Sequence, residues 1–77
     1  MSVLGKWKCS GVFLEFFDDG SYVRYNSNTG LKTVGNYQIY DNILDFKDLK
    51  TSFKYSNLGY GLMLTGADNS PTMFSKV

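Results

Sequence analysis

Few residues of this 77-residue chain have types and spacings that could do chemistry. Histidine is absent, which removes the commonest general base and a frequent zinc ligand. Cys9, the only cysteine, therefore has no imidazole partner, and we expect a small, partly buried strand residue. The Asp18–Gly20 segment is typical of a turn and lacks the spacing of a calcium loop. A Glu15–Asp45 acid/base pair is the weaker, enzymatic alternative, so we predict a non-enzyme with no catalytic residue, metal or cofactor.

Charge and composition further limit the class of protein and the partners that it can bind. Eight Lys and Arg against seven Asp and Glu give a net charge of +1, which provides no field to attract nucleic acid or a membrane. Hydrophobic residues make up 43% of the chain and aromatic residues 17%, enough for one small, dense core over residues 1–77. One cysteine allows no internal disulfide, and the start of the chain has no signal-peptide pattern. We therefore expect a single cytoplasmic domain.

The elements that must position any site are short strands. Apolar residues alternate with period 2, and turn residues recur every 8–12 positions. The expected strands cover residues 6–10, 12–17, 22–26, 31–40, 43–46, 52–56, 62–65 and 72–77. Gly35, inside the longest strand, predicts a bulge or sharp bend. The fold class predicted is all-β, a small antiparallel up-and-down meander of seven or eight strands closed into a barrel.

Four phrases stand in a fixed order along the chain. They are VLGKWK at 3–8, LEFFDDGSY at 14–22, GNYQIYDNILDF at 35–46, and the closing MFSKV. In this order they resemble the small lipocalin-like β-barrel domains of many bacterial proteins of unassigned function. The resemblance implies that Trp7 plugs one end of the barrel and is structural. Phages and mobile elements also carry short, free-standing proteins of this sort, and a phage-encoded copy would act in the host cytoplasm.

The Asp18–Gly20 turn determines which residues of the first hairpin lie on the same face. A three-residue link pairs Phe16 with Tyr22 and Glu15 with Val23, and it places Glu15 outside. The side chains expected inside are Val12, Leu14, Phe16, Tyr22, Tyr37, Ile39, Leu44 and Phe46, with Trp7, Phe53, Tyr55, Leu62 and Leu64 completing the core. Tyr40 and Ile43 are expected outside.

An apolar set is left over on the outer face. It comprises Phe13, Val23 and Tyr25, joined by Phe17 and Tyr40 if they lie close. Exposed patches of this kind mark protein–protein contacts, and cross-strand stabilisation of the sheet is the alternative. The leading hypothesis is a protein-interaction module that self-associates, as in a homodimer, or binds a protein partner. A phage-encoded copy would modulate a host protein by steric occlusion.

Two other functions stay open. Arg24 points inward at the barrel mouth in this register, where it would contact an anionic ligand or simply reach solvent. A carrier of a small apolar ligand is thus the second hypothesis, although the many large aromatic residues argue against a roomy interior. The third is single-stranded nucleic-acid binding by strands that interleave basic and aromatic residues, with Lys6, Lys8, Lys50 and Lys54 gathered in one patch.

Overall fold

The computed structural model describes residues 3–77, and these form eight strands joined by short turns. The strands are β1 Gly5–Cys9, β2 Val12–Phe16, β3 Ser21–Asn26, β4 Leu31–Tyr40, β5 Ile43–Phe46, β6 Thr51–Asn57, β7 Gly61–Thr65 and β8 Pro71–Lys76. The predicted all-β fold is confirmed, and every predicted strand end agrees with these bounds to within one residue. Within residues 3–77 no helix is long and apolar enough to cross a membrane.

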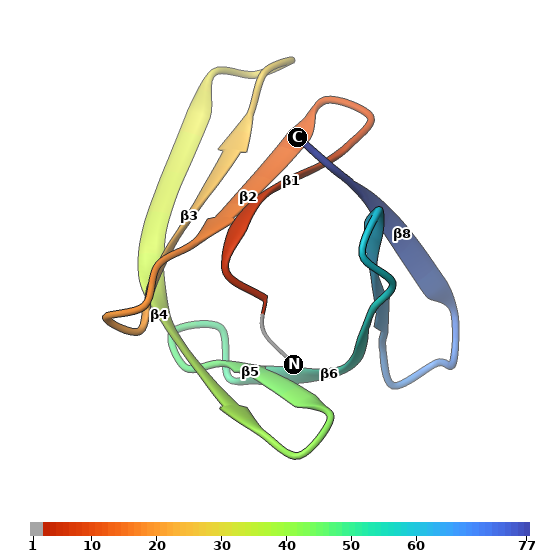
Figure 1. Cartoon of the computed structure of the whole chain (residues 1–77). Coiled ribbons are helices and arrows are strands. Elements are labelled where there is room, and N and C mark those ends of the chain that lie inside the picture. The colour runs from red at the N-terminus through yellow and green to blue at the C-terminus, as the bar shows by residue number, and fades with distance from the viewer. Residues whose placement is uncertain (1–2) are drawn as a thin grey trace.

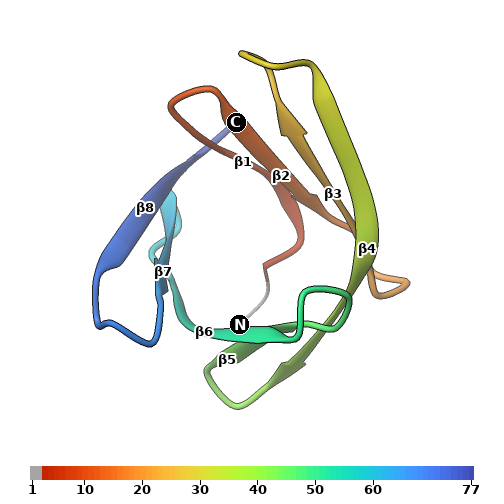
Figure 2. The same ribbon diagram turned by 180° about the vertical axis from the view of Figure 1, so that it is seen from behind.

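The strands form a closed antiparallel barrel in the order of the chain, which Figures 1 and 2 show from opposite sides. Each strand pairs with the next, and β8 returns to β1. This closing seam is short, because only Trp7 with Lys76 and Lys8 with Ser75 are paired. The Val77 N–H, which donates to the carbonyl of Lys6 at 3.0 Å, extends it. The predicted closure into a barrel is therefore confirmed.

The turn between β2 and β3 sets which residues of the hairpin face the core. Gly20 has a φ of 88°, the left-handed conformation that glycine adopts most readily, and the Phe17 N–H donates to the Ser21 carbonyl at 3.0 Å. The Asp19 carboxylate accepts hydrogen bonds from the Ser21 hydroxyl at 2.6 Å and the Ser21 N–H at 2.9 Å, which lower its pKa. The observed pairing of Phe16 with Tyr22 and of Glu15 with Val23 confirms the predicted register.

The core is almost the one that strand alternation predicts. The buried side chains are Val3, Trp7, Leu14, Phe16, Tyr22, Leu44, Phe46, Tyr55, Leu62, Leu64 and Phe74. Partly buried residues packed against them are Cys9, Val12, Tyr37, Ile39 and Phe53. Val3 and Phe74 were not predicted, and Cys9 is half-buried as expected. No charged side chain is buried among the described residues, so the interior is held by aromatic and aliphatic packing.

Gly35 does not mark the bulge that its position in a long strand predicts. The pairing of β3 with β4 runs from Ser21–Asn36 to Asn26–Leu31 with no extra residue. A side chain at position 35 would instead collide with Asp48, whose carboxylate atoms lie about 2.5 Å from the place that a Cβ would occupy. Glycine at this position therefore makes room for a carboxylate from the turn between β5 and β6.

Candidate functional site

The outer face of the first four strands carries two parallel rows of side chains. In the first row, Lys8 on β1 pairs with Phe13 on β2, Phe13 with Tyr25 on β3, and Tyr25 with Lys32 on β4. Because paired residues of neighbouring strands project to the same face, this row consists of two aromatic rings between two lysines. The rings of Phe13 and Tyr25 pack with centroids 6.3 Å apart and planes tilted by 40°.

The second row lies beside the first, two residues away from it on each strand. It runs from Lys6 through Glu15 and Val23 to Val34. The Lys6 ammonium lies 5.6 Å from the centroid of the Phe13 ring, a distance at which a cation–π attraction contributes. In both rows the β1 residue is thus a lysine that lies beside the apolar side chains. Glu15 lies within the second row, next to Lys6.

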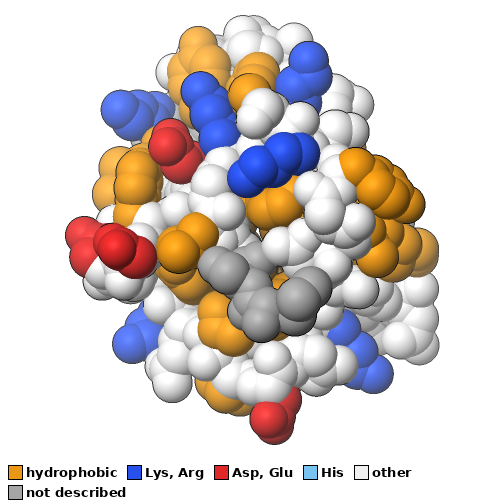
Figure 3. Space-filling model, viewed as in Figure 1, with side chains coloured by type: hydrophobic (Ala, Val, Ile, Leu, Met, Phe, Trp, Pro, Cys, Tyr) orange, Lys and Arg blue, Asp and Glu red, His pale blue; other side chains and the backbone are white. Residues whose placement is uncertain are grey.

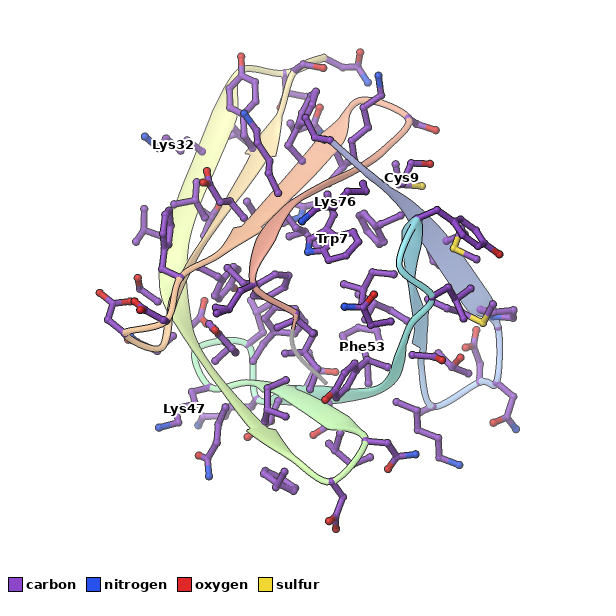
Figure 4. The ribbon with its side chains drawn as sticks, viewed as in Figure 1. Trp7, Cys9, Lys32, Lys47, Phe53 and Lys76 are labelled. Atoms are coloured by element: carbon purple, nitrogen blue, oxygen red, sulfur yellow. The ribbon has the colours of Figure 1, made fainter. Side chains whose placement is uncertain are left out.

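Between these rows the surface is hollowed into a groove of about 380 Å³. We call it the hairpin groove, and it is lined by Lys6, Phe13, Glu15, Val23, Tyr25 and Lys32. Tyr25 is 40% exposed there and Phe13 and Val23 are half-buried, so aromatic and aliphatic surface remains open to a partner. Figure 3 shows Lys and Arg side chains around hydrophobic ones over this part of the barrel. In Figure 4, Lys32 points away from the barrel while Trp7 points into it.

The groove unites three of the five residues predicted to bind a partner, namely Phe13, Val23 and Tyr25. Tyr40 is exposed but does not belong to this surface. It lies eight residues beyond Lys32 on β4, about 26 Å along an extended strand. Phe17 is also exposed, in the turn after β2, and lies outside the groove lining. Phe17 and Tyr40 were expected to join this surface only if they lie close to the other three residues, and neither belongs to the groove lining.

Sequence reasoning did not include Lys6 and Lys32 in this surface. The signal for Lys6 was present, because a two-residue turn at Ser10–Gly11 places Lys6 opposite Glu15. Lys32 follows in the same way from the turn that joins β3 to β4, which places it opposite Tyr25. Both positions required the register to be carried across a second turn.

The basic patch expected for nucleic-acid binding is not formed as predicted. Lys6 and Lys8 lie on β1, whereas Lys54 lies on β6 and Lys50 in the turn before it. β7 and β8 separate these two pairs in the barrel. The positive charge beside the hairpin groove comes from Lys6 and Lys8 on β1 and from Lys32 on β4, a residue that the predicted patch does not include.

The interior of the barrel contains a smaller cavity. It has a volume of about 240 Å³ and is lined by Leu14, Tyr22, Arg24, Phe46, Leu49, Phe53, Leu64, Thr72 and Phe74. Arg24 is on the inward-facing side of β3, as predicted, and its side chain is exposed at the mouth. Arg24 is the only charged residue in an otherwise mainly apolar lining.

Tyr22 and Asp48 form a polar contact beside this cavity. The Tyr22 hydroxyl donates to the Asp48 carboxylate, with distances of 3.2 and 3.1 Å to its two oxygens. Burial, the hydrogen bond to Asp48 and the negative charge of Asp48 together raise the pKa of Tyr22 to about 12, and Arg24 opposes this shift. Because the tyrosinate would face a carboxylate, the fold favours the neutral phenol.

We expect the barrel to lose stability as the pH rises from about 10 to about 12. In this window the folded state keeps the Tyr22 proton that the unfolded state has released, so the free energy of unfolding falls with increasing pH. Tyr22→Phe should show a shallower loss, because it has no hydroxyl to ionise. Urea unfolding at several pH values measures both slopes, and Tyr60→Phe, which removes an exposed phenol, is the control. Equal slopes for wild type and Tyr22→Phe would contradict the assignment.

The remaining candidates for chemistry are engaged in local hydrogen bonds or lie apart. Asp45 accepts a hydrogen bond from the Ser52 hydroxyl at 3.1 Å, and its strand β5 is separated from that of Glu15 by β3 and β4. The Glu15–Asp45 pair is therefore not formed. Among residues 3–77, no cluster of three or more Cys, Asp or Glu side chains could hold a metal ion.

The fold and the groove together define a class: a small eight-stranded antiparallel β-barrel with an aromatic core and a lysine-flanked apolar groove on its outer face. No protein-family model, no curated protein and no solved structure matches this chain. The likeness to small lipocalin-like domains therefore rests on the sequence motifs and stays a prediction.

Proposed function

We propose that this barrel is a non-enzymatic binding module that contacts another protein through the hairpin groove. The observation that carries the proposal is the gathering of Phe13, Val23 and Tyr25 in one groove, on the opposite face of the hairpin from the core. These side chains are not needed to fill the barrel, because Leu14, Phe16 and Tyr22 already do so. In a phage-encoded copy, the partner would be a host protein whose surface the barrel covers.

The chemical character of the groove favours a protein over a nucleic acid. Aromatic side chains at the centre with charged groups around them are typical of protein interfaces. Glu15 lies among the lining residues, where its carboxylate would repel a phosphate backbone. The carboxylates of Asp19, Asp45 and Asp48 support the non-enzymatic part of the proposal, because each accepts a hydrogen bond within the fold.

The interior cavity favours a second candidate, a carrier of a small apolar ligand with an anionic group held by Arg24. Its volume of about 240 Å³ lies below the range of about 300–1,000 Å³ that is usual for ligand sites. We therefore rank this candidate second. Saturable binding of a short-chain fatty acid, weakened by Arg24→Gln and unaffected by changes in the hairpin groove, would raise it above the first.

The proposed function is tested with the double substitution Phe13→Ser/Tyr25→Ser. We expect it to weaken partner capture or self-association at least tenfold while the barrel stays folded, since the two side chains are outside the core. Tyr60→Ser/Met73→Ser is the matched control, because it removes exposed apolar side chains 73% and 38% accessible on another part of the surface. Sedimentation velocity measures self-association, and affinity capture with mass spectrometry measures heterologous binding.

Each result bears on the proposal. Loss of binding in the Phe13/Tyr25 variant but not in the control supports it. Monomeric behaviour of all three proteins, with captured proteins that do not differ between them, overturns it. Salt-sensitive binding of a labelled single-stranded oligonucleotide, lost in the Phe13/Tyr25 variant, would assign the groove to nucleic acid instead.

A further inference from the structure

The first half of β4 has a neighbouring strand on one side only. Leu31–Asn36 pairs with β3, whereas β5 pairs with β4 only from Tyr37 to Tyr40. Figures 1 and 2 both show the hairpin of β3 and β4 extending beyond β5. Even in this closed barrel, this stretch of β4 therefore keeps an open edge.

The hydrogen bonds show which backbone groups this edge presents. The Tyr37 N–H donates to the Gly20 carbonyl at 2.9 Å, and in an antiparallel ladder alternate residues point their backbone groups to the same side. Positions 31, 33, 35 and 37 therefore face β3, and positions 32, 34 and 36 face away. The Asn36 carbonyl, which accepts from Lys47 N–H at 3.0 Å, agrees with this alternation.

Lys32 and Val34 thus each turn an N–H and a C=O outward. Within residues 3–77 no strand or side chain pairs with these four groups, and the flanking segment is open to solvent, with Leu31 66% and Val34 65% exposed. An exposed edge of this kind is a template for an added strand unless proline, a bulge or charge blocks it. Here neither proline nor a bulge is present, and Lys32 is the only charge.

We infer that Lys32–Val34 receives an extended, acidic segment of a partner protein as an added antiparallel strand. The inference rests on the proposed function, because it names the partner's binding mode. Lys32 is shared between the edge and the hairpin groove, so a segment that places its carboxylate at Lys32 can continue over the aromatic side chains with apolar residues, which Glu15 does not repel. On the outer face, a carboxylate opposite Lys32 and an aliphatic side chain opposite Val34 complete the contact.

Charge favours such a segment over a second copy of the chain. Two β4 edges related by a twofold axis at Thr33 would form four backbone hydrogen bonds but would place Lys32 opposite Val34, leaving both lysines without a carboxylate. An acidic strand supplies the missing charge.

The test uses the whole protein and a capped peptide with the central sequence valine–threonine–glutamate between flanking threonines. Antiparallel pairing places the valine opposite Val34 and the glutamate opposite Lys32. In a titration followed by ¹H–¹⁵N NMR, we expect the largest shifts and slowed amide exchange at Lys32 and Val34. A peptide with lysine in place of glutamate should bind at least tenfold more weakly.

Two variants test the backbone hydrogen bonds and the charge pair of this contact separately. Val34→Pro removes an outward N–H without removing a bond to β3, and it should abolish peptide binding. Lys32→Glu should reverse the preference between the two peptides, and Lys54→Glu, the same charge change on β6, should leave it unaltered.

Shifts confined to the hairpin groove, or binding insensitive to both edge variants, would overturn the inference. The proposed function would survive that result if partner capture still depended on Phe13 and Tyr25. A dimer that Val34→Pro abolishes would assign the edge to a second copy and equally overturn it.

Discussion

Replacing Trp7 by alanine is expected to lower the free energy of unfolding by about 3–5 kcal/mol. A 77-residue domain has a total stability of only about 4–12 kcal/mol, so this loss removes from about a quarter to all of that stability. No other single truncation removes as large a buried side chain, because Trp7 is the only tryptophan and is 1% exposed.

The large effect follows from three contacts of the indole. The ring packs in the core cluster, so truncation leaves a cavity. Its Nε1–H donates to the Val3 carbonyl at 2.9 Å, which ties the segment before β1 to the barrel. The Lys76 ammonium lies 4.6 Å from the ring centroid, which links β8 to the ring beside the short β1–β8 seam (Figure 4). Trp7→Ala therefore weakens the core and the closure of the barrel together.

Guanidinium unfolding followed by far-ultraviolet circular dichroism measures this loss. Trp7→Phe keeps part of the apolar volume but lacks the N–H, so it should fall between wild type and Trp7→Ala. Lys76→Gln removes only the cation over the ring and should cost about 0.5–2 kcal/mol. A Trp7→Ala barrel as stable as the Lys76→Gln barrel would show that the indole is not a principal part of the core.

The architecture was predictable because its signals are local. A glycine in the left-handed region after two aspartates fixes the register of the first hairpin, and alternation then assigns Leu14 and Phe16 to the core. The burial of Val3 was not predictable in this way, since it depends on the segment before β1 meeting Trp7. The role of Gly35 likewise depends on Asp48, which reaches it from a turn remote in the sequence.

The candidate site was predictable only in part, because only some of its residues are placed by a local turn signal. Phe13, Val23 and Tyr25 come from the first hairpin, whose register follows from the Asp18–Gly20 turn, and they do form one surface. Lys6 and Lys32 come from the strands on either side, and their positions require pairings across two more turns. The open edge at Lys32–Val34 follows from the predicted bounds of β4 and β5, because a four-residue β5 that pairs from Tyr40 cannot reach the first half of β4.

The two faces of the first hairpin should respond very differently to the same substitution. Phe16→Ser is expected to cost at least about 3–5 kcal/mol, because it removes a phenyl ring from the core and buries a hydroxyl. Phe16 is 2% exposed, and its ring lies 5.0 Å from that of Tyr37 and 6.1 Å from that of Phe46 between centroids. Phe13→Ser loses the ring contact with Tyr25 and the cation–π contact with Lys6, both at the surface, and should cost about 0.5–1.5 kcal/mol.

This pair of variants separates the structural face from the binding face, since both change phenylalanine to serine on β2. Urea unfolding should rank Phe16→Ser far below Phe13→Ser, which should stay close to wild type. Partner capture, compared at equal amounts of folded protein, should be weakened by Phe13→Ser and not by Phe16→Ser. The reason is that Phe13 lines the hairpin groove and Phe16 does not. Equal destabilisation by the two substitutions would mean that Phe13 is structural. The apolar outer face would then serve to stabilise a very small sheet, and this result would contradict the proposed binding role of the hairpin groove.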